Sequence, residues 1–154
     1  MKKVRFIILT VVLLIIAFYL SIHIANNHIA ETIKQKLLDC SLPAGTQLLE
    51  SESFAGKMSG NGNGMQWYGI ILVKSSQDET ALYEWFNSMM NDDADESLMV
   101  FEQNSPEIFD AGNKTFKMYT GEEGCYQIRL VKESLVGYEQ SFWESILNCD
   151  IRAH

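Results

Sequence analysis

The amino-acid sequence predicts an α+β protein: an N-terminal transmembrane helix followed by a small domain with a mainly antiparallel β-sheet and one or two packing helices. Three observations support this prediction. Residues 6–25 form an almost wholly apolar run, two strand-like stretches flank a Gly/Asn-rich turn, and later stretches change between strand-like and helical hydrophobic spacing. After the apolar run the expected order of elements is β-β-α-β-β-β-α.

Residues 6–25 have the length and composition of a transmembrane helix. Twenty residues span about 30 Å as a helix, which matches the hydrocarbon core of a bilayer. Only His23 in this run can carry a charge, and Tyr19 and His23 suit an interfacial depth. Residues 1–5 form a basic flank that carries Lys2, Lys3 and Arg5, so the positive-inside rule predicts a cytosolic N-terminus and an extracytoplasmic domain.

A cleaved signal peptide is the main alternative, and it would make the protein secreted. The apolar run is longer than the roughly 7–15 residues of a typical signal peptide, and cleavage after Ala25 or Ala30 would place a histidine at the outer small-residue position. Residues 37–40 resemble a lipidation box, but Asp39 directly precedes Cys40 and the apolar run is distant. The sequence therefore favours an uncleaved single-pass anchor.

Residues 26–40 are expected to form a juxtamembrane helix that continues the transmembrane helix without a break. Ile29, Ile33 and Leu37 recur every four residues, which predicts one apolar stripe that packs on the domain. A dimer seam is a second interpretation, although two heptads are short for a coiled coil. Pro43 and Gly45 stop the helix, so the extracytoplasmic domain is expected over residues 41–154.

The domain is expected to begin with a β-hairpin. Residues 46–58 and 65–74 read as strands, and Asn61-Gly62 or Asn63-Gly64 supplies the positive φ angles that a tight turn needs. The glycine-rich loop could also cradle phosphate, but it lacks the Lys-Ser/Thr ending and leads into a strand, not a helix. The second strand is apolar on both faces, which is typical of a central strand covered on both sides.

The rest of the domain is expected to hold a helix, three strands and a short C-terminal helix. Ser76 with Glu79 reads as a capping box, and the stripe that follows it is predicted to face the core. That stripe consists of Leu82, Trp85, Phe86 and Met89. The strands are predicted at 98–103, 114–120 and 125–132, with the Glu122–Gly124 turn between the last two. Tyr138, Phe142 and Ile146 predict the final helix.

The composition excludes some functions and leaves few candidate sites. The net charge is −8, and residues 31–154 hold all twenty acids against nine bases, so a nucleic-acid-binding domain is not expected. Residues 91–102 match part of a calcium loop, but Glu96 occupies the position that requires glycine and the exit is strand-like. A solvated acidic loop is therefore favoured, and no metal or cofactor is expected.

The sequence predicts no catalytic, cofactor-binding or metal-binding residues. The histidines are His23, His28 and His154, and no hydrolase or metalloprotease motif occurs. Three cysteines, Cys40, Cys125 and Cys149, permit one disulfide or none, and a buried apolar role is equally compatible.

Two segments carry a resemblance to a known group of proteins. Residues 60–66, Gly-Asn-Gly-Asn-Gly-Met-Gln, run into the strand 69–75, and the C-terminal residues 150–154 read Asp-Ile-Arg-Ala-His. Together they resemble an uncharacterised family of small membrane-anchored extracytoplasmic proteins of Gram-positive anaerobic bacteria, with Ala153 where that family usually has glycine. The resemblance implies the architecture and a location at the bacterial surface, and it implies no activity.

These observations predict a non-enzymatic extracytoplasmic binding or accessory module. Its partners would be the lipid bilayer, through residues 6–25, and a membrane or envelope protein. The competing hypothesis is a small envelope enzyme that uses carboxylates. The C-terminal residues Asp150, Ile151 and Arg152 are expected to pack on the domain, with Ile151 tucked in and Asp150 and Arg152 free to pair.

Overall fold

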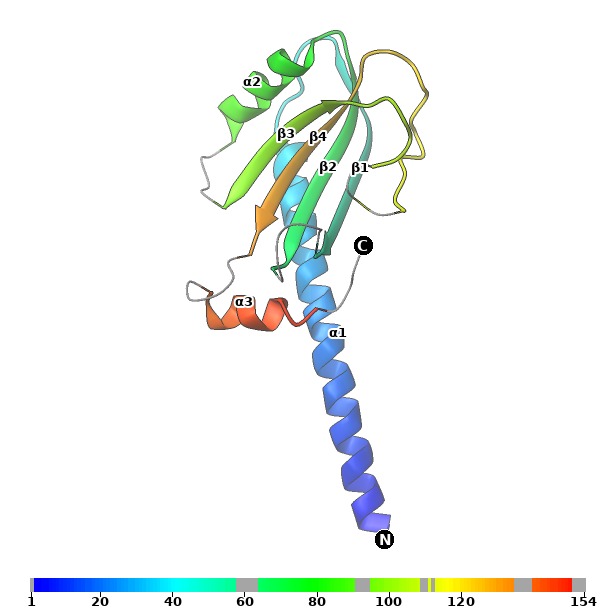
Figure 1. Cartoon of the computed structure of the whole chain (residues 1–154), viewed down its shortest axis with the longest axis vertical. Coiled ribbons are helices and arrows are strands. Elements are labelled where there is room, and N and C mark those ends of the chain that lie inside the picture. Colours follow the sequence, from blue (N-terminus) through cyan, green and yellow to red (C-terminus); the bar gives the residue numbers. More distant parts are fainter. Residues whose placement is uncertain are drawn as a thin grey trace.

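The computed structural model describes residues 2–57, 64–90, 95–108, 111, 113–134 and 140–150. Its elements follow the order α1 (Lys2–Asp39), β1 (Thr46–Gly56), β2 (Gln66–Ser75), α2 (Glu79–Met89), β3 (Glu96–Glu102), β4 (Cys125–Glu133) and α3 (Phe142–Leu147). The long helix α1 projects from a four-stranded sheet, as Figure 1 shows. The predicted α+β class is confirmed.

The sheet is antiparallel throughout and has the strand order β1-β2-β4-β3. The central strand β2 is buried at nine of its ten positions, because α1 lies against one face and the segment between β3 and β4 against the other. This confirms the prediction from its two apolar faces. The hairpin is confirmed by the pairing of Gly56 with Gln66, whereas its turn at Asn61–Asn63 lies outside the described residues.

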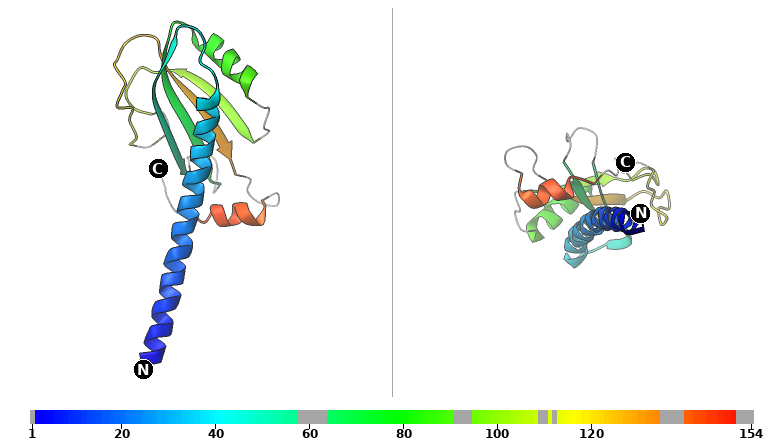
Figure 2. Two further views of the ribbon diagram at one scale, coloured as in Figure 1. Left: turned by 180° about the vertical axis from the view of Figure 1, so that it is seen from behind. Right: turned by 90° about the horizontal axis from the view of Figure 1, so that it is seen from below.

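Helix α1 is continuous over 38 residues, which confirms the prediction that it runs on to Asp39. Residues 4–21, the apolar half of α1, are exposed at every position. Residues 22–39, the packed half, bury one stripe against the sheet, as viewed from behind in Figure 2. Ile33 and Leu37 are fully enclosed in the main core and Ile29 packs at its edge, so the predicted stripe is confirmed as a packing face.

A glycine allows the packed half of α1 to approach the sheet closely. A Cβ atom on Gly69 would lie 2.4 Å from the backbone nitrogen of Lys34 and 2.5 Å from its Cα. Only a residue without a side chain fits there, because the helix backbone itself occupies the space. Beside this contact Trp67, Ile71 and Val73 face α1 and join the main core with Ile128 and Leu130 of β4.

The opposite face of the sheet carries a second, smaller core. Phe54, Tyr68, Ile70, Leu72 and Val131 project from the strands, and Ile108, Ala111 and Phe116 cover them from the segment that joins β3 to β4. The rings of Phe54 and Tyr68 stack with centroids 4.6 Å apart. Helices therefore cover one face of the sheet, and a segment without regular secondary structure covers the other.

The strand predicted at 114–120 is wrong. Residues 114–120 form no strand, and Thr115 makes only an isolated bridge with Glu107. Local backbone bonds explain this result: Phe116 donates to the Pro106 carbonyl, and Ile108 donates to the Lys114 carbonyl. These bonds use the groups that a fifth strand would offer to the sheet. The strands predicted at 98–103 and 125–132 correspond to β3 and β4 and are confirmed.

The predicted capping box of α2 is also wrong, because the N-cap is Asp78. The Asp78 carboxylate accepts a bond from the Ala81 amide at 2.8 Å, and Ser76 lies before the helix, where its amide donates to Gly45. A capping box does form at α3, where Ser141 and Glu144 bond reciprocally. Of the stripe predicted to face the core, Leu82 and Phe86 are buried, but Trp85 and Met89 remain partly exposed.

Candidate functional site

The most unusual local chemistry of the described residues is a polar cluster at the base of the domain. We call His23, Asn26, Trp67 and Asp150 the base cluster. Asn26 and Asp150 have no exposed surface and Trp67 is 2 % exposed. The cluster joins three parts of the chain that are remote in sequence: helix α1, strand β2 and the segment that follows α3.

Asn26 is the hub of the base cluster. Its amide nitrogen donates to Asp150 Oδ2 at 2.9 Å and to the Leu147 carbonyl at 3.1 Å. Its amide oxygen accepts from the Trp67 indole at 2.9 Å. Because an indole N–H can only donate, this contact fixes the orientation of the Asn26 amide. A buried amide with every group bonded stabilises one arrangement of the three segments.

His23 completes the base cluster on its exposed side. Its Nδ1 lies 2.9 Å from Asp150 Oδ1, a distance typical of an ion pair, although the direction of the ring N–H is poor for a hydrogen bond. The imidazole is 29 % exposed, whereas the carboxylate is fully enclosed. The Asp150 carboxylate is buried against α1, and the expected pairing with Arg152 involves a residue outside the described part of the chain. The packing of Asp150 on the domain agrees with the prediction, and residues 151–154 lie outside the described residues.

A second candidate is a cavity of about 280 Å³ at the other end of the packed half. It is lined by Lys36, Asp39, Cys40, Met89, Met90 and Glu96. Two carboxylates line this cavity, but each has a nearby partner: Lys36 Nζ lies 2.5 Å from Glu96, and Gln35 donates to Asp39 at 2.9 Å. The cavity therefore has mixed polarity and offers no pair of carboxylates arranged for acid–base chemistry.

Cys40 is poorly suited to be a nucleophile in this cavity. Burial raises the pKa of its thiol, and the negative charge of Asp39 raises it further. A catalytic or metal-binding cysteine needs the thiolate, which a cationic environment favours. All three cysteines are free thiols, with Cys125 buried and Cys149 exposed, so no disulfide forms here. Within the described ranges, no group of three or more His, Cys, Asp or Glu residues could hold a metal ion.

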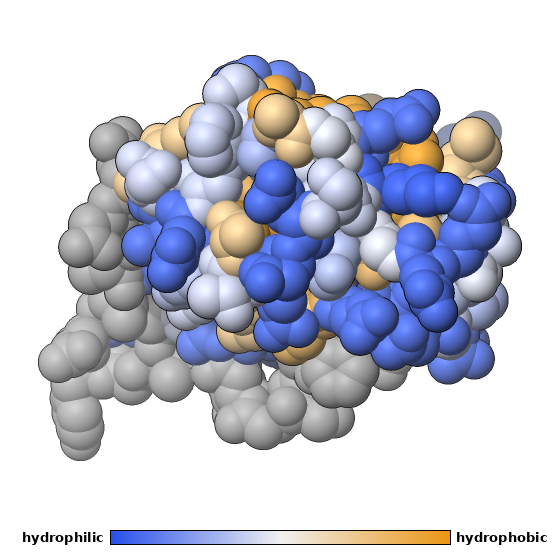
Figure 3. All heavy atoms as spheres, turned by 90° about the horizontal axis from the view of Figure 1, so that it is seen from above, coloured by the Kyte–Doolittle hydropathy of each residue, from blue (hydrophilic) through white to orange (hydrophobic). Residues whose placement is uncertain are grey.

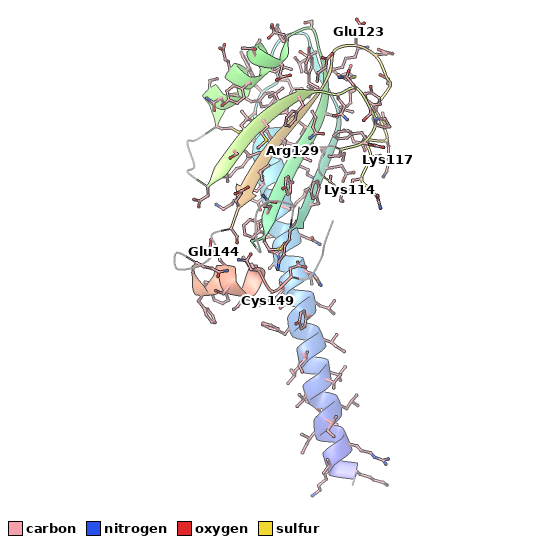
Figure 4. The ribbon with its side chains drawn as sticks, viewed as in Figure 1. Lys114, Lys117, Glu123, Arg129, Glu144 and Cys149 are labelled. Carbon is pink, nitrogen blue, oxygen red and sulfur yellow. The ribbon has the colours of Figure 1, made fainter. Side chains whose placement is uncertain are left out.

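A third polar group is enclosed on the face of the sheet that carries the smaller core. The Arg129 guanidinium lies 5.6 Å from the ring centroids of both Tyr68 and Phe101. With the Gln127 amide oriented to satisfy its neighbours, its oxygen accepts from Arg129 and its nitrogen donates to Gln103. Figure 4 shows Arg129 within the sheet, with Lys114 and Lys117 on the covering segment. This arrangement encloses the cation between aromatic rings and connects the strand to the covering segment, which is a structural role.

The first four residues of the partial calcium-loop match at 91–102, Asn91–Ala94, lie outside the described residues. Its second half is strand β3, so the chain leaves the loop in an extended conformation, unlike the helical exit of a calcium loop. The solvated-loop interpretation is favoured, as it was from sequence.

Sequence reasoning found the position of His23 at the end of the apolar run but missed the cluster around it. The available signal was a pair of polar residues, His23 and Asn26, spaced three apart on an otherwise apolar helix. Such residues in a membrane-adjacent helix usually face a polar partner. The partner, Asp150, lies 124 positions from Asn26, so only the fold could identify it.

No protein-family model matches this chain, and no curated protein or solved structure is significantly similar to it. By length and composition, α1 could cross a membrane, and its apolar half is compatible with a single-pass anchor.

Proposed function

We propose that this protein is a single-pass membrane-anchored, extracytoplasmic module that binds a membrane or envelope partner without catalysing a reaction. The observation that carries the proposal is the division of α1. Its apolar half exposes large side chains on every side, and its packed half belongs to the main core of the domain. A helix that is apolar all around needs a nonpolar environment, and the domain does not supply one for residues 4–21.

The orientation of the anchor follows from charge. Lys2, Lys3 and Arg5 precede the apolar run, whereas the domain is acidic. The positive-inside rule then places residues 1–5 in the cytosol and the domain outside the cell. The end of the domain farthest from the N-terminus is covered mainly by hydrophilic residues (Figure 3), which suits a surface that faces water.

The base cluster supports an uncleaved anchor over a signal peptide. Cleavage after Ala25 would remove Ile22 and His23 from the base of the domain, and cleavage after Ala30 would also remove Asn26. The second cut would leave the Trp67 indole and the Asp150 carboxylate without their buried amide partner. Loss of buried hydrogen-bond partners costs about 1–3 kcal/mol per group, so a mature chain that starts there would be destabilised.

The non-enzymatic part of the proposal rests on the state of the polar groups described above. The carboxylates that line the cavity are already bonded to neighbours, and the pKa of the Cys40 thiol is raised instead of lowered. The alternative of an envelope enzyme would need a different set of groups. A bacterial-surface origin, as the resemblance implies, remains part of the proposal.

Topology is tested by adding protease to intact spheroplasts and measuring the surviving mass. The domain should be digested while a fragment that includes the basic flank survives. The matched variant Leu13→Arg should weaken membrane retention, because an arginine at mid-helix costs about 2.5–3.5 kcal/mol of insertion free energy. A protected domain, or a mature chain that starts after Ala25 or Ala30, would contradict the anchor.

Partner binding is tested by cross-linking in native membranes followed by mass spectrometry. The expected result is a reproducible cross-linked protein that disappears when the domain is unfolded by a core substitution. The matched control is the Leu13→Ala chain, which retains both the anchor and the domain. If no specific cross-link forms in any growth condition, the binding function is wrong, even where the topology is correct.

A further inference from the structure

Helix α3 displays an aromatic pair that nothing in the described part of the domain covers. Phe142 is 73 % exposed and Trp143 is 71 % exposed, the highest values among the large apolar side chains of the described residues. Their rings contact each other edge to face, with centroids 5.6 Å apart. Exposure of two adjacent large aromatic side chains is costly in water and points to a nonpolar or interfacial environment.

The position of α3 relates this pair to the apolar half of α1. Helix α3 lies across the direction of α1, below the sheet and on the side of the N-terminus (Figures 1 and 2). It is fixed there by the base cluster, since Leu147 at its end accepts a bond from Asn26 and the following Asp150 contacts His23. In Figure 4, side chains of α3 project away from the sheet. The aromatic pair is therefore level with the point where α1 leaves the domain.

The length of the apolar half places that point at the surface of a bilayer. Residues 6–21 are sixteen uncharged, exposed positions, which span about 24 Å as a helix. A bilayer core is about 30 Å thick, so the span continues for about one more turn, into residues 22–25. The domain already packs on α1 at Ile22. The base of the domain must therefore reach the boundary between the headgroups and the acyl chains.

We propose that α3 lies in this boundary as an interfacial contact, with Phe142 and Trp143 inserted among lipids of the outer leaflet. This inference rests on the membrane anchor proposed above. Tryptophan is enriched at this depth, because its ring combines a large apolar body with a polar N–H. Residues 140–150 contain no Lys or Arg and include Glu144 and Asp150, so the contact depends on apolar burial and not on anionic lipid. Together with the anchor α1, this contact of α3 with the membrane restricts the tilt and depth of the domain.

The test measures quenching of Trp143 fluorescence by lipid. The full chain is reconstituted into zwitterionic vesicles whose phospholipids are brominated either near the headgroup end or near the far end of the acyl chain. The chain contains three tryptophans, so the Trp143 signal is the difference between the wild type and Trp143→Phe. The matched control is Trp85→Phe, because Trp85 lies on α2 and donates to the Ser41 carbonyl beyond the packed half of α1.

The expected result is stronger quenching by bromine near the headgroup end, with loss of the quenched component in Trp143→Phe and its retention in Trp85→Phe. Equal fluorescence in brominated and ordinary vesicles would overturn the proposal. A blue-shifted Trp143 signal that is unquenched and depends on protein density would also overturn it, and would indicate that a second protein covers the pair. Flotation of the chain with the vesicles separates these outcomes: a chain that does not float disproves the anchor itself, whereas a chain that floats with unquenched Trp143 disproves only the contact.

Discussion

The two halves of α1 have the same backbone geometry but opposite surroundings. In residues 4–21 the apolar side chains point in every direction and all are exposed. In residues 22–39 the buried positions are Ile22, Asn26, Ala30, Ile33 and Leu37, which lie on one stripe with polar residues around it. Apolar periodicity, and not helix propensity, therefore distinguishes the helix segment that is apolar on all sides from the segment that packs one face on the domain.

The apolar half of α1 also has a fixed orientation relative to the domain. No Gly or Pro interrupts residues 1–42, and α1 continues without a break from one half to the other. A flexible linker would let the domain sample many orientations. A continuous helix that belongs to both parts fixes the direction of the sheet relative to the apolar half instead, and in the proposed anchor this would also set its direction relative to the membrane normal. The base cluster reinforces this arrangement where the two halves meet.

The largest expected effect is the difference between truncating a leucine in the packed half of α1 and truncating one in the apolar half. Leu37→Ala should lower the free energy of unfolding of the domain by about 2–5 kcal/mol, because Leu37 is fully enclosed. Leu13→Ala, at a position that is 56 % exposed, should change it by less than about 0.5 kcal/mol. Chemical denaturation in detergent, followed by near-ultraviolet circular dichroism, measures both. Equal losses would show that the apolar half packs on the domain.

A loss of similar size is expected from removing the hub of the base cluster. Asn26→Ala leaves the Trp67 indole and the Asp150 carboxylate without this partner, at about 1–3 kcal/mol for each group. The control is Thr32→Ala on the same helix, since the Thr32 hydroxyl is exposed and bonds only its own helix. Thermal unfolding of the two variants should differ by several degrees. If Asn26→Ala unfolds like the control, the cluster does not hold α1 to the domain.

The next effect concerns the close contact between α1 and β2. Gly69→Ala should cost about 1–3 kcal/mol, because the added methyl group overlaps the backbone of Lys34 and the helix must shift. Gly121→Ala is a useful control, because an added Cβ would meet nothing within 4 Å and only its positive φ of 73° is strained. A neutral Gly69→Ala would mean that α1 sits farther from the sheet than described.

The smallest expected effect is the pH-dependent contribution of Glu31 to stability. Glu31 lies on the exposed side of the packed half. Hydrogen bonds from Lys34 and Ser53 lower the pKa of Glu31 below its ordinary value of 4.5. The folded state therefore favours the charged carboxylate, so its contribution is present above about pH 4.5 and is lost as the pH falls through the folded-state pKa. Because Glu31 is half exposed, Glu31→Gln should cost at most about 0.5 kcal/mol at pH 7. Melting temperatures of both chains should converge once the pH falls below the folded-state pKa of Glu31.

The regular parts of this fold could be predicted because their signals are local. The apolar run, the four-residue stripe and the two hydrophobic faces of β2 each specify an environment within a short window. The strand at 114–120 was predicted from similar local signals. It failed because the Phe116 amide donates to the Pro106 carbonyl and the Lys114 carbonyl accepts from the Ile108 amide. The α2 cap failed because Ser76 and Asp78 both suit a helix start, and only the backbone path decides between them.

The base cluster could be predicted only in part. His23 and Asn26 are visible as polar positions on an apolar helix, and Gly69 is visible as a glycine inside a strand. Neither the polar positions nor the glycine identifies which other element of the fold packs against it. The Asp150 contact and the exposed aromatic pair on α3 depend on how the chain returns to α1 after β4, which no local pattern encodes.

The most direct test of the central claim, that one helix is shared between membrane and domain, is a spin-label accessibility scan along α1 in bilayer nanodiscs. Labels at single cysteines are introduced on a background in which Cys40, Cys125 and Cys149 are replaced by alanine. Collisions with oxygen should dominate at residues 6–21 and be most frequent near Ile15 and Ile16, in the middle of the span. Labels at the exposed positions Thr32 and Gln35 of the packed half should instead be accessible to a water-soluble relaxant. High accessibility to the water-soluble relaxant throughout residues 6–21 would contradict the account.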